Sequence, residues 1–213
     1  ALEECILHFE DEYFYAHPGV NPVSLGRAIK QNLTSAKRIS GGSTITMQVL
    51  RMSRQNPPRT YWEKVKEMYM AVRMEFTYSK TEILNLYVSH APYGGNVVGA
   101  EAASWRYFNR PLTDLSWAEY ATLAVLPNAP ALIRPGKNSE KLKAKRDRLL
   151  HKLMENEVID SSTYSLSLLE PLPDKPNPLP SNAYHLLQYI AKHGGEGQRN
   201  QTTIDGQLQR KAT

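Results

Sequence analysis

The segment EDEYFYAHPG, residues 10–19, carries the side chains of this sequence that are best suited to acid–base chemistry. Glu10 and Asp11 precede an aromatic run and His17. An apolar neighbourhood raises the pKa of a carboxyl group toward use as a general base, and an alcohol nucleophile needs such a base at neutral pH. Glu10 is therefore a candidate catalytic residue, and the alternative is that the segment is only an acidic helix end.

A second candidate carboxylate, Glu67, lies among cations. Lys64 and Lys66 flank it closely, and Arg51 and Arg59 bracket a proline break upstream. A turn between two helices could gather these cations around one anion, such as a pyrophosphate whose charge must be stabilised if it is to leave. Two alternatives stay open, a surface glutamate with a lysine partner and a set of scattered, solvated cations.

The segment GGSTITMQ, residues 41–48, has the composition of a helix N-terminus. Gly41 and Gly42 allow close backbone approach, and Ser43 or Thr44 is a suitable N-cap. Amides at such a terminus point outward and favour anions, so the segment predicts an anion-binding helix start. It is not a P-loop, because no Gly-Lys-Ser/Thr follows.

Helix-forming residues dominate the segments that must position these side chains. Ala, Leu, Met, Glu and Lys are frequent in YWEKVKEMYMAVRMEF and SWAEYATLAVL, so we expect mostly helix. One long helix is expected over residues 60–76, and Ser24 is expected to cap a helix through LGRAIKQNL. Ser79 and Ser116 are each followed three residues later by Glu, the pattern of a capping box.

The composition suits a soluble globular protein, with 41% hydrophobic and 22% charged residues in 213. No run of about 18 apolar residues is present, so no segment is predicted to span a membrane. The chain starts abruptly in patterned sequence without a targeting signal, which suggests a fragment of a longer protein. The lone Cys5 cannot form an internal disulfide and is expected in the core.

Basic residues are concentrated between Tyr13 and Trp62, where seven Lys or Arg occur without any Asp or Glu. Such a positive field attracts phosphates or an anionic membrane surface. A solvated basic face is the alternative.

Five motifs in chain order resemble the signatures of glycosyltransferase family 51. They are EDEYFYAHPGV, GGSTITMQ, KVKE at 64–67, KTEILNLYVS at 80–89, and GAEAASWRYF followed by LSWAEYATLAVLPNAP. The family comprises the peptidoglycan glycosyltransferase domain of class A penicillin-binding proteins and the monofunctional transglycosylases. Within it, the motifs are most similar to the penicillin-binding protein 1C type.

The resemblance implies a mainly α, lysozyme-like fold with a large lobe and a small membrane-facing jaw. It implies polymerisation of lipid II into β-1,4-linked glycan strands with inversion and release of undecaprenyl pyrophosphate, in bacterial cell wall biosynthesis. The basic segment from Arg27 to Arg38 falls where the jaw and its loop are expected. The resemblance implies that Glu67 either holds a divalent cation cofactor, Mg²⁺ or Mn²⁺, or orients the network around the pyrophosphate, and both roles stay open.

By the same resemblance, Glu10 is the catalytic base and Glu67 acts on the leaving-group side. The implied substrate-binding residues are Asp11, His17, Ser43, Thr44, Gln48, Arg51, Arg59, Lys64 and Lys66. For Ser43 a role as helix cap, and for His17 a structural hydrogen bond, stay open beside substrate contact. Lys80 and Glu82 are as well explained by a helix start, and Phe14, Tyr87 and Trp105 are expected in the core.

Three positions depart from the family signatures. Glu63 stands where Arg is usual, Met47 replaces a common Gln, and Ser89 replaces the usual Asn. One phosphate-binding cation is therefore missing at position 63, and Arg59 or Lys66 is the expected substitute. Both acids and Lys64 are present, so we do not infer an inactive enzyme.

We expect a glycosyltransferase domain at residues 1–170, followed at 171–213 by a proline-rich linker and the start of a truncated transpeptidase region. The last assignment depends on the segment QTTIDGQLQ, which resembles the entrance to a transpeptidase domain. Expected partners are lipid II, the growing glycan strand, the membrane surface and the transpeptidase domain of the full-length chain, with no nucleic acid. The expected location is the outer, periplasmic face of the bacterial cytoplasmic membrane, anchored by an N-terminal transmembrane helix outside this chain.

Two rival functions stay open at this stage. One is a lysozyme-like hydrolase, in which Glu10 protonates a glycosidic oxygen and water attacks. The cation cluster argues against it, because glycan hydrolysis releases no pyrophosphate. The other is a lipid-surface or nucleic-acid binding module built on the basic stretch, which predicts salt-sensitive binding that does not depend on Glu10.

Overall fold

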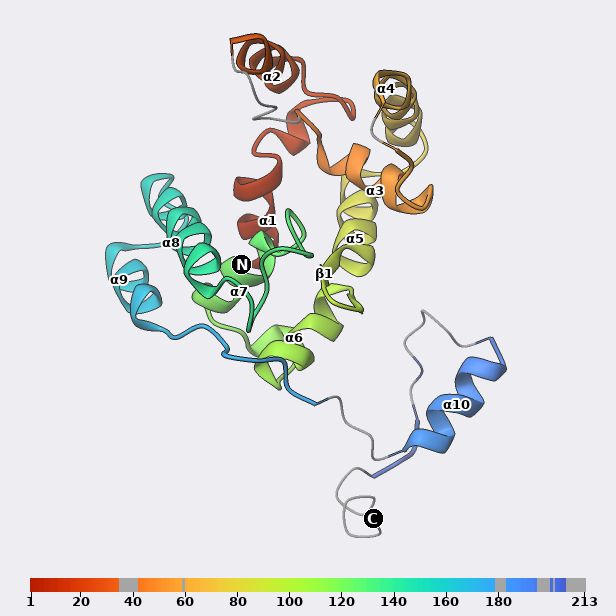
Figure 1. Cartoon of the computed structure of the whole chain (residues 1–213), viewed down its shortest axis with the longest axis vertical. Helices are drawn as coiled ribbons and strands as arrows, with labels where there is room; N and C mark the ends of the chain where they lie inside the picture. The colour runs from red at the N-terminus through yellow and green to blue at the C-terminus, as the bar shows by residue number, and fades with distance from the viewer. Residues whose placement is uncertain (35–41, 59, 179–182, 195–199, 201, 206–213) are drawn as a thin grey trace. The chain divides into compact units, whose positions relative to one another are not determined.

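The computed structural model describes residues 1–34, 42–58, 60–178, 183–194, 200 and 202–205. The chain divides into two compact units, Ala1–Asn177 and Pro178–Thr213. The described residues are predominantly helical, as predicted (Figure 1). The division follows Asn177, whereas the sequence placed a domain boundary after residue 170, and that boundary stays a prediction.

The elements of the first unit follow one another with short connections. They are α1 Leu2–Glu10, η1 Phe14–Ala16, α2 Pro22–Thr34, α3 Ile45–Ser53, α4 Tyr61–Glu75, α5 Lys80–His90, β1 Pro92–Gly94, β2 Val97–Val98, α6 Ala100–Phe108, η2 Leu112–Asp114, α7 Trp117–Val125, α8 Ser139–Glu155 and α9 Ser161–Leu169. The strands form one antiparallel hairpin that pairs Pro92 with Val98. In the second unit, the described helix is α10 Tyr184–Lys192.

The core of the first unit is built where α1 packs on α7 and α8. Helix α7 is apolar on nearly all sides, and a helix of this kind must be buried. Cys5 in α1 is fully buried, as predicted, and burial raises the pKa of its thiol to about 12. It is therefore a small core side chain.

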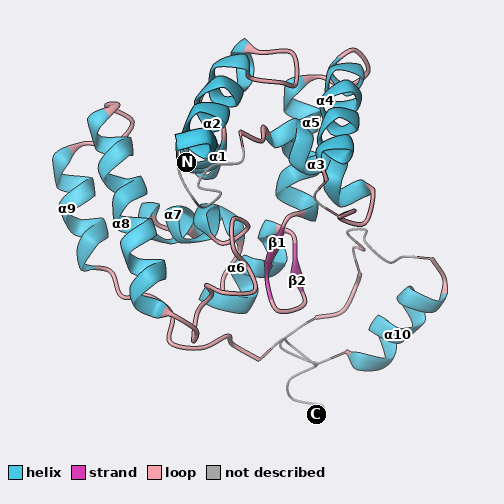
Figure 2. Ribbon diagram, turned by 45° about the horizontal axis from the view of Figure 1, so that its top comes forward, coloured by secondary structure: helices cyan, strands magenta, loops and turns pink. Residues whose placement is uncertain are grey.

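A second packing group joins α3 to α4 and α5, which lie side by side in Figure 2. Thr44 caps α3 by accepting a hydrogen bond from the amide of Met47. Ser79 and Glu82 form the predicted capping box at the start of α5, and Ser116 begins α7 in the same way. Local sequence signals thus set the starts of the helices that carry the candidate site.

Three expectations differ from the structure. Helix α2 begins at Pro22, and Oδ1 of Asn21 accepts from the amide of Ser24 at 3.0 Å, so Asn21 is the cap in place of Ser24. Proline suits the first helical position because its missing N–H would be unpaired there. Trp105 is 39% exposed, so its assignment to the core was wrong. Helix α10 was missed in the region expected to be linker.

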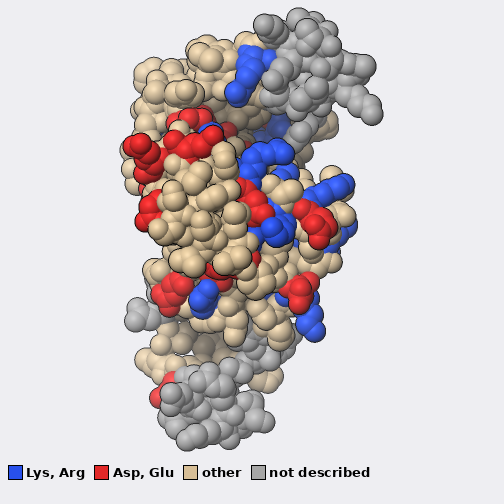
Figure 3. All heavy atoms as spheres, turned by 90° about the vertical axis from the view of Figure 1, so that its left-hand side faces the viewer, with Lys and Arg blue, Asp and Glu red and all other residues tan. Residues whose placement is uncertain are grey.

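Acidic and basic side chains are interspersed on the face shown in Figure 3. On helix α8, Lys143 pairs with Asp147 at 2.6 Å, and Lys152 pairs with Glu12 at 2.7 Å. In the part of the chain that the structure describes, no helix combines the length and apolar character needed to cross a membrane. The basic segment from Arg27 to Arg38 lies mostly outside the residues whose side chains are described.

Candidate active site

A cavity of about 400 Å³ is lined by four of the predicted site residues, Glu10, Ser43, Gln48 and Arg51. We call it the Glu10 cleft. Its lining includes Glu10, Arg27, Ser43, Gln48, Arg51, Tyr87 and Asn128. These residues come from α1, α2, the start of α3, α3, α5 and the loop after α7, so the cleft is assembled from elements far apart in the sequence.

Glu10 is the last residue of α1 and lies against α3. Nε2 of Gln48 donates a hydrogen bond of 2.8 Å to its Oε2, while Oε1 is buried and has no hydrogen-bond partner among the described residues. Burial raises the pKa of Glu10 above its usual value, and the hydrogen bond from Gln48 and the positive charge of Lys145 partly oppose this shift. A carboxylate with a raised pKa and a free oxygen is equipped to accept a proton.

Asp11 and His17 are both buried and contact each other. Nε2 of His17 lies 3.0 Å from both carboxylate oxygens of Asp11, and the amide of Ile45 donates to Oδ2 of Asp11 at 3.1 Å. The sequence predicted that the start of α3 binds an anion, and in the structure the carboxylate of Asp11 occupies that position. The observed contacts of Asp11 and His17 hold α1, the loop after it and α3 together. That these two residues also contact the substrate stays a prediction.

Ser43 and Thr44 occupy different environments although they are adjacent. Thr44 is buried and caps α3, and its hydroxyl donates a hydrogen bond of 2.6 Å to the carbonyl of Gly19. Ser43 lines the Glu10 cleft, and its Oγ accepts a hydrogen bond of 2.7 Å from Nζ of Lys64. Ser43 therefore faces the space where a ligand would bind, whereas Thr44 supports the backbone.

Arg51, Lys64 and Glu67 are brought together between α3 and α4, as the sequence suggested. Glu67 is 1% exposed and accepts on Oε1 from Nε of Arg51 at 2.7 Å and from Nη2 at 2.5 Å. Nζ of Lys64 lies 3.7 Å from Oε2 of Glu67. The two cations and one anion leave net positive charge beside the cleft. The surface-glutamate alternative for Glu67 is excluded by its burial.

Lys66 and Glu63 of α4 pair with each other rather than with Glu67. Lys66 is largely exposed and contacts Glu63 at 3.1 Å, and Nη2 of Arg54 contacts the same carboxylate at 2.7 Å. Glu63, the departure from the family signature, therefore pairs with two neighbouring cations. Arg59 lies outside the described residues, so its predicted contact with substrate stays a prediction.

The residues around Glu67 do not fit a resident divalent cation. Such ions need several oxygen ligands, and Glu67 offers only Oε2 without a hydrogen-bond partner, next to Lys64. Across the described residues, no group of three or more His, Cys, Asp or Glu is arranged to hold a metal. The predicted Mg²⁺ or Mn²⁺ remains untested, and the local charge favours an anion.

Residues outside the predicted site also line the cleft. Among them are Asn128 and Arg27, which was expected in the basic segment. Nζ of Lys145 in α8 donates a hydrogen bond of 2.6 Å to Oδ1 of Asn128. Burial lowers the pKa of Lys145, and the charge of Glu10 acts in the opposite direction. The sequence signal for Asn128 was the proline-rich loop PNAP, and Lys145 had none beyond its place on a charged helix.

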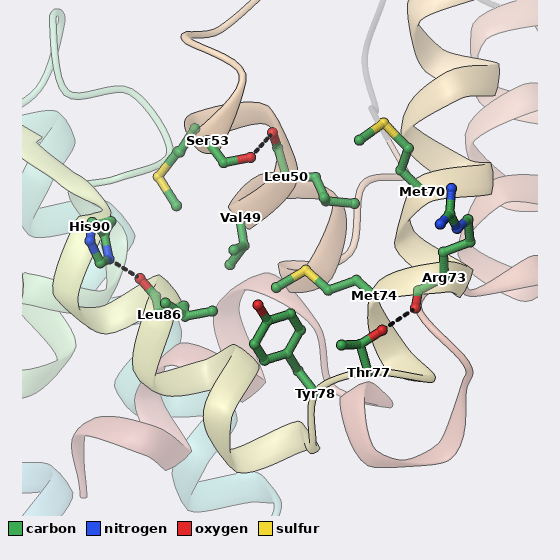
Figure 4. Close-up of a pocket in the computed structure, with 11 residues that line it drawn as sticks. Val49, Leu50, Ser53, Met70, Arg73, Met74, Thr77, Tyr78, Leu86 and His90 are labelled. Carbon is green, nitrogen blue, oxygen red and sulfur yellow. Dashed lines mark hydrogen bonds between the residues drawn. The ribbon is translucent and has the colours of Figure 1, made fainter.

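A larger pocket of about 640 Å³ lies between α3, α4 and α5 (Figure 4). Its lining is mainly apolar and includes Val49, Met70, Met74 and Leu86. It does not contain Glu10 or Glu67, and no carboxylate lies among the described residues that line it. The Glu10 cleft is therefore the candidate active site.

Comparison with known proteins places this chain in a family. The pattern of the transglycosylase family matches residues 1–154. Penicillin-binding protein 1C of Escherichia coli (strain K12) is 39% identical over 208 residues, covering 98% of this chain and 27% of that protein. Penicillin-binding protein 1B of the same organism is 33% identical over 82% of the chain and 21% of its own length.

A third relative, penicillin-binding protein 1F of Bacillus subtilis (strain 168), is 36% identical over 70% of the chain and 21% of its own length. The chain thus spans about a quarter of the length of the curated relatives it matches. The family match covers Glu10, Gln48, Arg51, Lys64 and Glu67 together. The chain therefore belongs to the transglycosylase family, as its five signatures predicted.

Proposed function

We propose that this chain is a peptidoglycan glycosyltransferase that polymerises lipid II into β-1,4-linked glycan strands, with inversion and release of undecaprenyl pyrophosphate. Membership of the transglycosylase family supports this reaction class. The observation that carries the proposal is the Glu10 cleft itself. It contains a buried carboxylate of raised pKa and, on the same lining, the guanidinium of Arg51.

Proton removal is the task of Glu10. The acceptor 4-hydroxyl of lipid II is a poor nucleophile at neutral pH, so a base must take its proton as the new bond to C1 of the donor forms. Gln48 occupies Oε2 of Glu10, which leaves Oε1 for the substrate hydroxyl. Attack on the face opposite the leaving group converts an α-linked donor into a β-link in one step.

The cations between α3 and α4 stabilise the negative charge of the departing pyrophosphate. The C1–O bond to the pyrophosphate breaks as the negative charge on that oxygen grows, and fixed cations stabilise it. Arg51 lines the cleft, and Lys64 reaches Ser43 at its edge. Glu67 is bound to Arg51 and holds that guanidinium in place. We therefore assign Glu67 an orienting role on the leaving-group side.

Exposed aromatic residues on α4 support contact with a membrane surface, where lipid II resides. Tyr61, Trp62 and Tyr69 are between 65% and 96% exposed. Rings of this kind favour the boundary between headgroups and acyl chains. The transpeptidase region, the membrane anchor and the periplasmic location stay predictions.

The test is polymerisation of labelled lipid II by the 213-residue chain, with moenomycin as inhibitor of the expected reaction. We expect glycan chains from the parent and from the matched control Glu12→Gln, which removes a neighbouring carboxylate that pairs with Lys152. Glu10→Gln is expected to reduce the rate by at least about 100-fold, the usual contribution of a general base.

Two outcomes would contradict the proposal. Cleavage of preformed glycan without any polymer would identify a hydrolase. Polymerisation by Glu10→Gln at the parental rate would show that another group is the base. Omission and addition of Mg²⁺ or Mn²⁺ in the same assay tests the predicted cofactor.

A further inference from the structure

Two buried oxygens in the Glu10 cleft lack hydrogen-bond partners among the described residues. They are Oε1 of Glu10 and the hydroxyl of Tyr87, and both residues line the cleft. Buried polar groups are nearly always paired in native proteins, so two orphans in one site call for an explanation. Tyr87 is 1% exposed and belongs to α5, which packs on α3, and Gln48 of α3 lines the same cleft.

The two groups are chemically complementary. Burial raises the pKa of Tyr87 well above its usual value, and the negative charge of Glu10 raises it further. The phenol therefore keeps its proton and acts as a donor. The carboxylate of Glu10 is an acceptor with two lone pairs on each oxygen, so Oε1 can accept from a phenol and from a substrate hydroxyl together.

We propose that Tyr87 is a positioning residue for Glu10, its hydroxyl directed at Oε1 through a bridging water or by a small rotation of the carboxylate. Gln48 holds Oε2, and the two contacts together fix the plane of the base. A bridging water is the usual partner for polar groups in such a place. This inference rests on the proposed function, in which Glu10 is the base.

Tyr93 provides an internal comparison. Its hydroxyl is also buried and without a partner among the described residues, but it does not line the Glu10 cleft. Burial alone raises the pKa of Tyr93, with no contribution from Glu10. The two phenols are neighbours, because Tyr93 also contributes to the raised pKa of Tyr87. Removing a buried hydroxyl is therefore expected to have the same general effect at positions 87 and 93, whereas a direct effect on the titration of Glu10 is expected only at position 87.

Other charged groups around Glu10 are accounted for. Asp11 follows it at the end of α1, Gln48 of α3 donates to it, Lys145 of α8 acts on its pKa, and Arg27 and Arg51 line the same cleft. On α7, Glu119 is paired with Arg110. None of these contacts changes when only the phenol oxygen of Tyr87 is removed, so a change in the titration of Glu10 reports on that oxygen.

The experiment compares Tyr87→Phe, Tyr93→Phe and the parent chain by two measurements. The first is kcat/KM for lipid II polymerisation against pH. Loss of a donor to the carboxylate raises the pKa of Glu10, so the acid limb of the pH profile of Tyr87→Phe moves to higher pH. On that limb kcat/KM should be about fivefold below the parental value. At the alkaline end of the profile it should be near the parental value. Tyr93→Phe is expected to follow the parent.

The second measurement is the titration of Glu10 by NMR of ¹³C-labelled glutamate, assigned with Glu10→Gln. It needs no activity, so it separates failure of this inference from failure of the proposed function. The pKa of Glu10 is expected to rise in Tyr87→Phe only, and to fall when 3-fluorotyrosine, a stronger donor, replaces Tyr87. Identical titration of Glu10 in parent and Tyr87→Phe would overturn the inference, as would an equal shift in Tyr93→Phe.

Discussion

Arg51 contacts one carboxylate oxygen of the buried Glu67 twice, through Nε at 2.7 Å and through Nη2 at 2.5 Å. The side chain of Glu67 is 1% exposed and that of Arg51 is 18% exposed. The two partners are thus unequal, because only the arginine reaches water at the cleft. Removing one or the other should have different consequences.

Arg51→Ala should destabilise the fold more than Glu67→Gln. The first change removes the arginine that binds the buried carboxylate and leaves only Nζ of Lys64, 3.7 Å from Oε2, which costs about 3 kcal/mol of the free energy of unfolding. The second leaves a cation that water can reach, so about 1 kcal/mol is expected. Urea unfolding of the two single variants and the double variant measures this difference.

The double variant should lose less stability than the sum of the two single losses, since the contact can be lost only once. Arg54→Ala, which breaks the more exposed pair with Glu63, is the matched control and should cost less than Arg51→Ala. Strict additivity of Arg51→Ala and Glu67→Gln would mean that the observed contact does not couple the two residues.

Asp11→Asn should lower the free energy of unfolding by about 1–3 kcal/mol, because an amide nitrogen, which cannot accept a hydrogen bond, replaces one of the two oxygens that lie 3.0 Å from Nε2 of His17. KM for lipid II should change little. Thermal unfolding and steady-state kinetics provide the two readouts.

Asp114→Asn makes the same chemical change at an exposed position and should leave both quantities near the parental values. The opposite pattern in Asp11→Asn, an unchanged stability with a raised KM, would make Asp11 a substrate contact as the sequence resemblance implied.

Local signals made the helix starts predictable. The capping boxes at Ser79 and Ser116 and the cap at Thr44 depend on residues only three positions apart, so sequence alone specifies them. The helix start at Pro22 was misjudged because Asn21 and Ser24 are both good capping residues, and only the backbone geometry decides between them.

Contacts between residues far apart in the sequence could not be predicted from such local signals. The sequence brought Glu67 close to Arg51 through charge complementarity, but it did not show that Asp11 would face the start of α3. It also did not show that Lys145 of α8 would approach Glu10, because that depends on how α1 packs on α8. Tyr87 was correctly expected to be buried, yet its neighbour Glu10 was not evident from periodicity.

Glu10→Gln should stabilise the chain at neutral pH, by on the order of 1 kcal/mol, as is common when a strained site group is removed. The pKa of Glu10 is higher in the folded state than in the unfolded state. The folded state therefore binds the proton more tightly, and stability falls as pH rises from the unfolded-state pKa through the folded-state pKa. Urea unfolding at pH 7 and at mildly acidic pH tests this.

The advantage of Glu10→Gln should shrink in acid, where Glu10 is protonated in both states. Glu12→Gln provides a control of opposite sign, because the contact with Lys152 lowers the pKa of Glu12. That variant should be slightly less stable than the parent at neutral pH. A Glu10→Gln variant less stable than the parent at pH 7 would show that the carboxylate is not strained in the fold.

Gly19→Ala should be severe and Gly26→Ala mild, although both replace one hydrogen by a methyl group. Gly19 has a φ of +83°, and a Cβ there would lie 2.6 Å from the carbonyl oxygen of Ala71 in α4. We expect a loss of at least about 2 kcal/mol in the free energy of unfolding. Gly26 lies in α2 with open space around it, and alanine should stabilise that helix by about 0.5–1 kcal/mol.

The consequence of Gly19→Ala for catalysis should exceed its consequence for folding. The carbonyl of Gly19 accepts a hydrogen bond of 2.6 Å from Thr44, the cap of the helix that carries Gln48 and Arg51. Moving this loop away from α4 shifts the start of α3 relative to Glu10, and misplacement of about 1 Å can cost 100-fold in rate. Lipid II polymerisation measured well below the unfolding temperature separates the two effects, and parental kcat in a folded Gly19→Ala chain would show that the loop does not position α3.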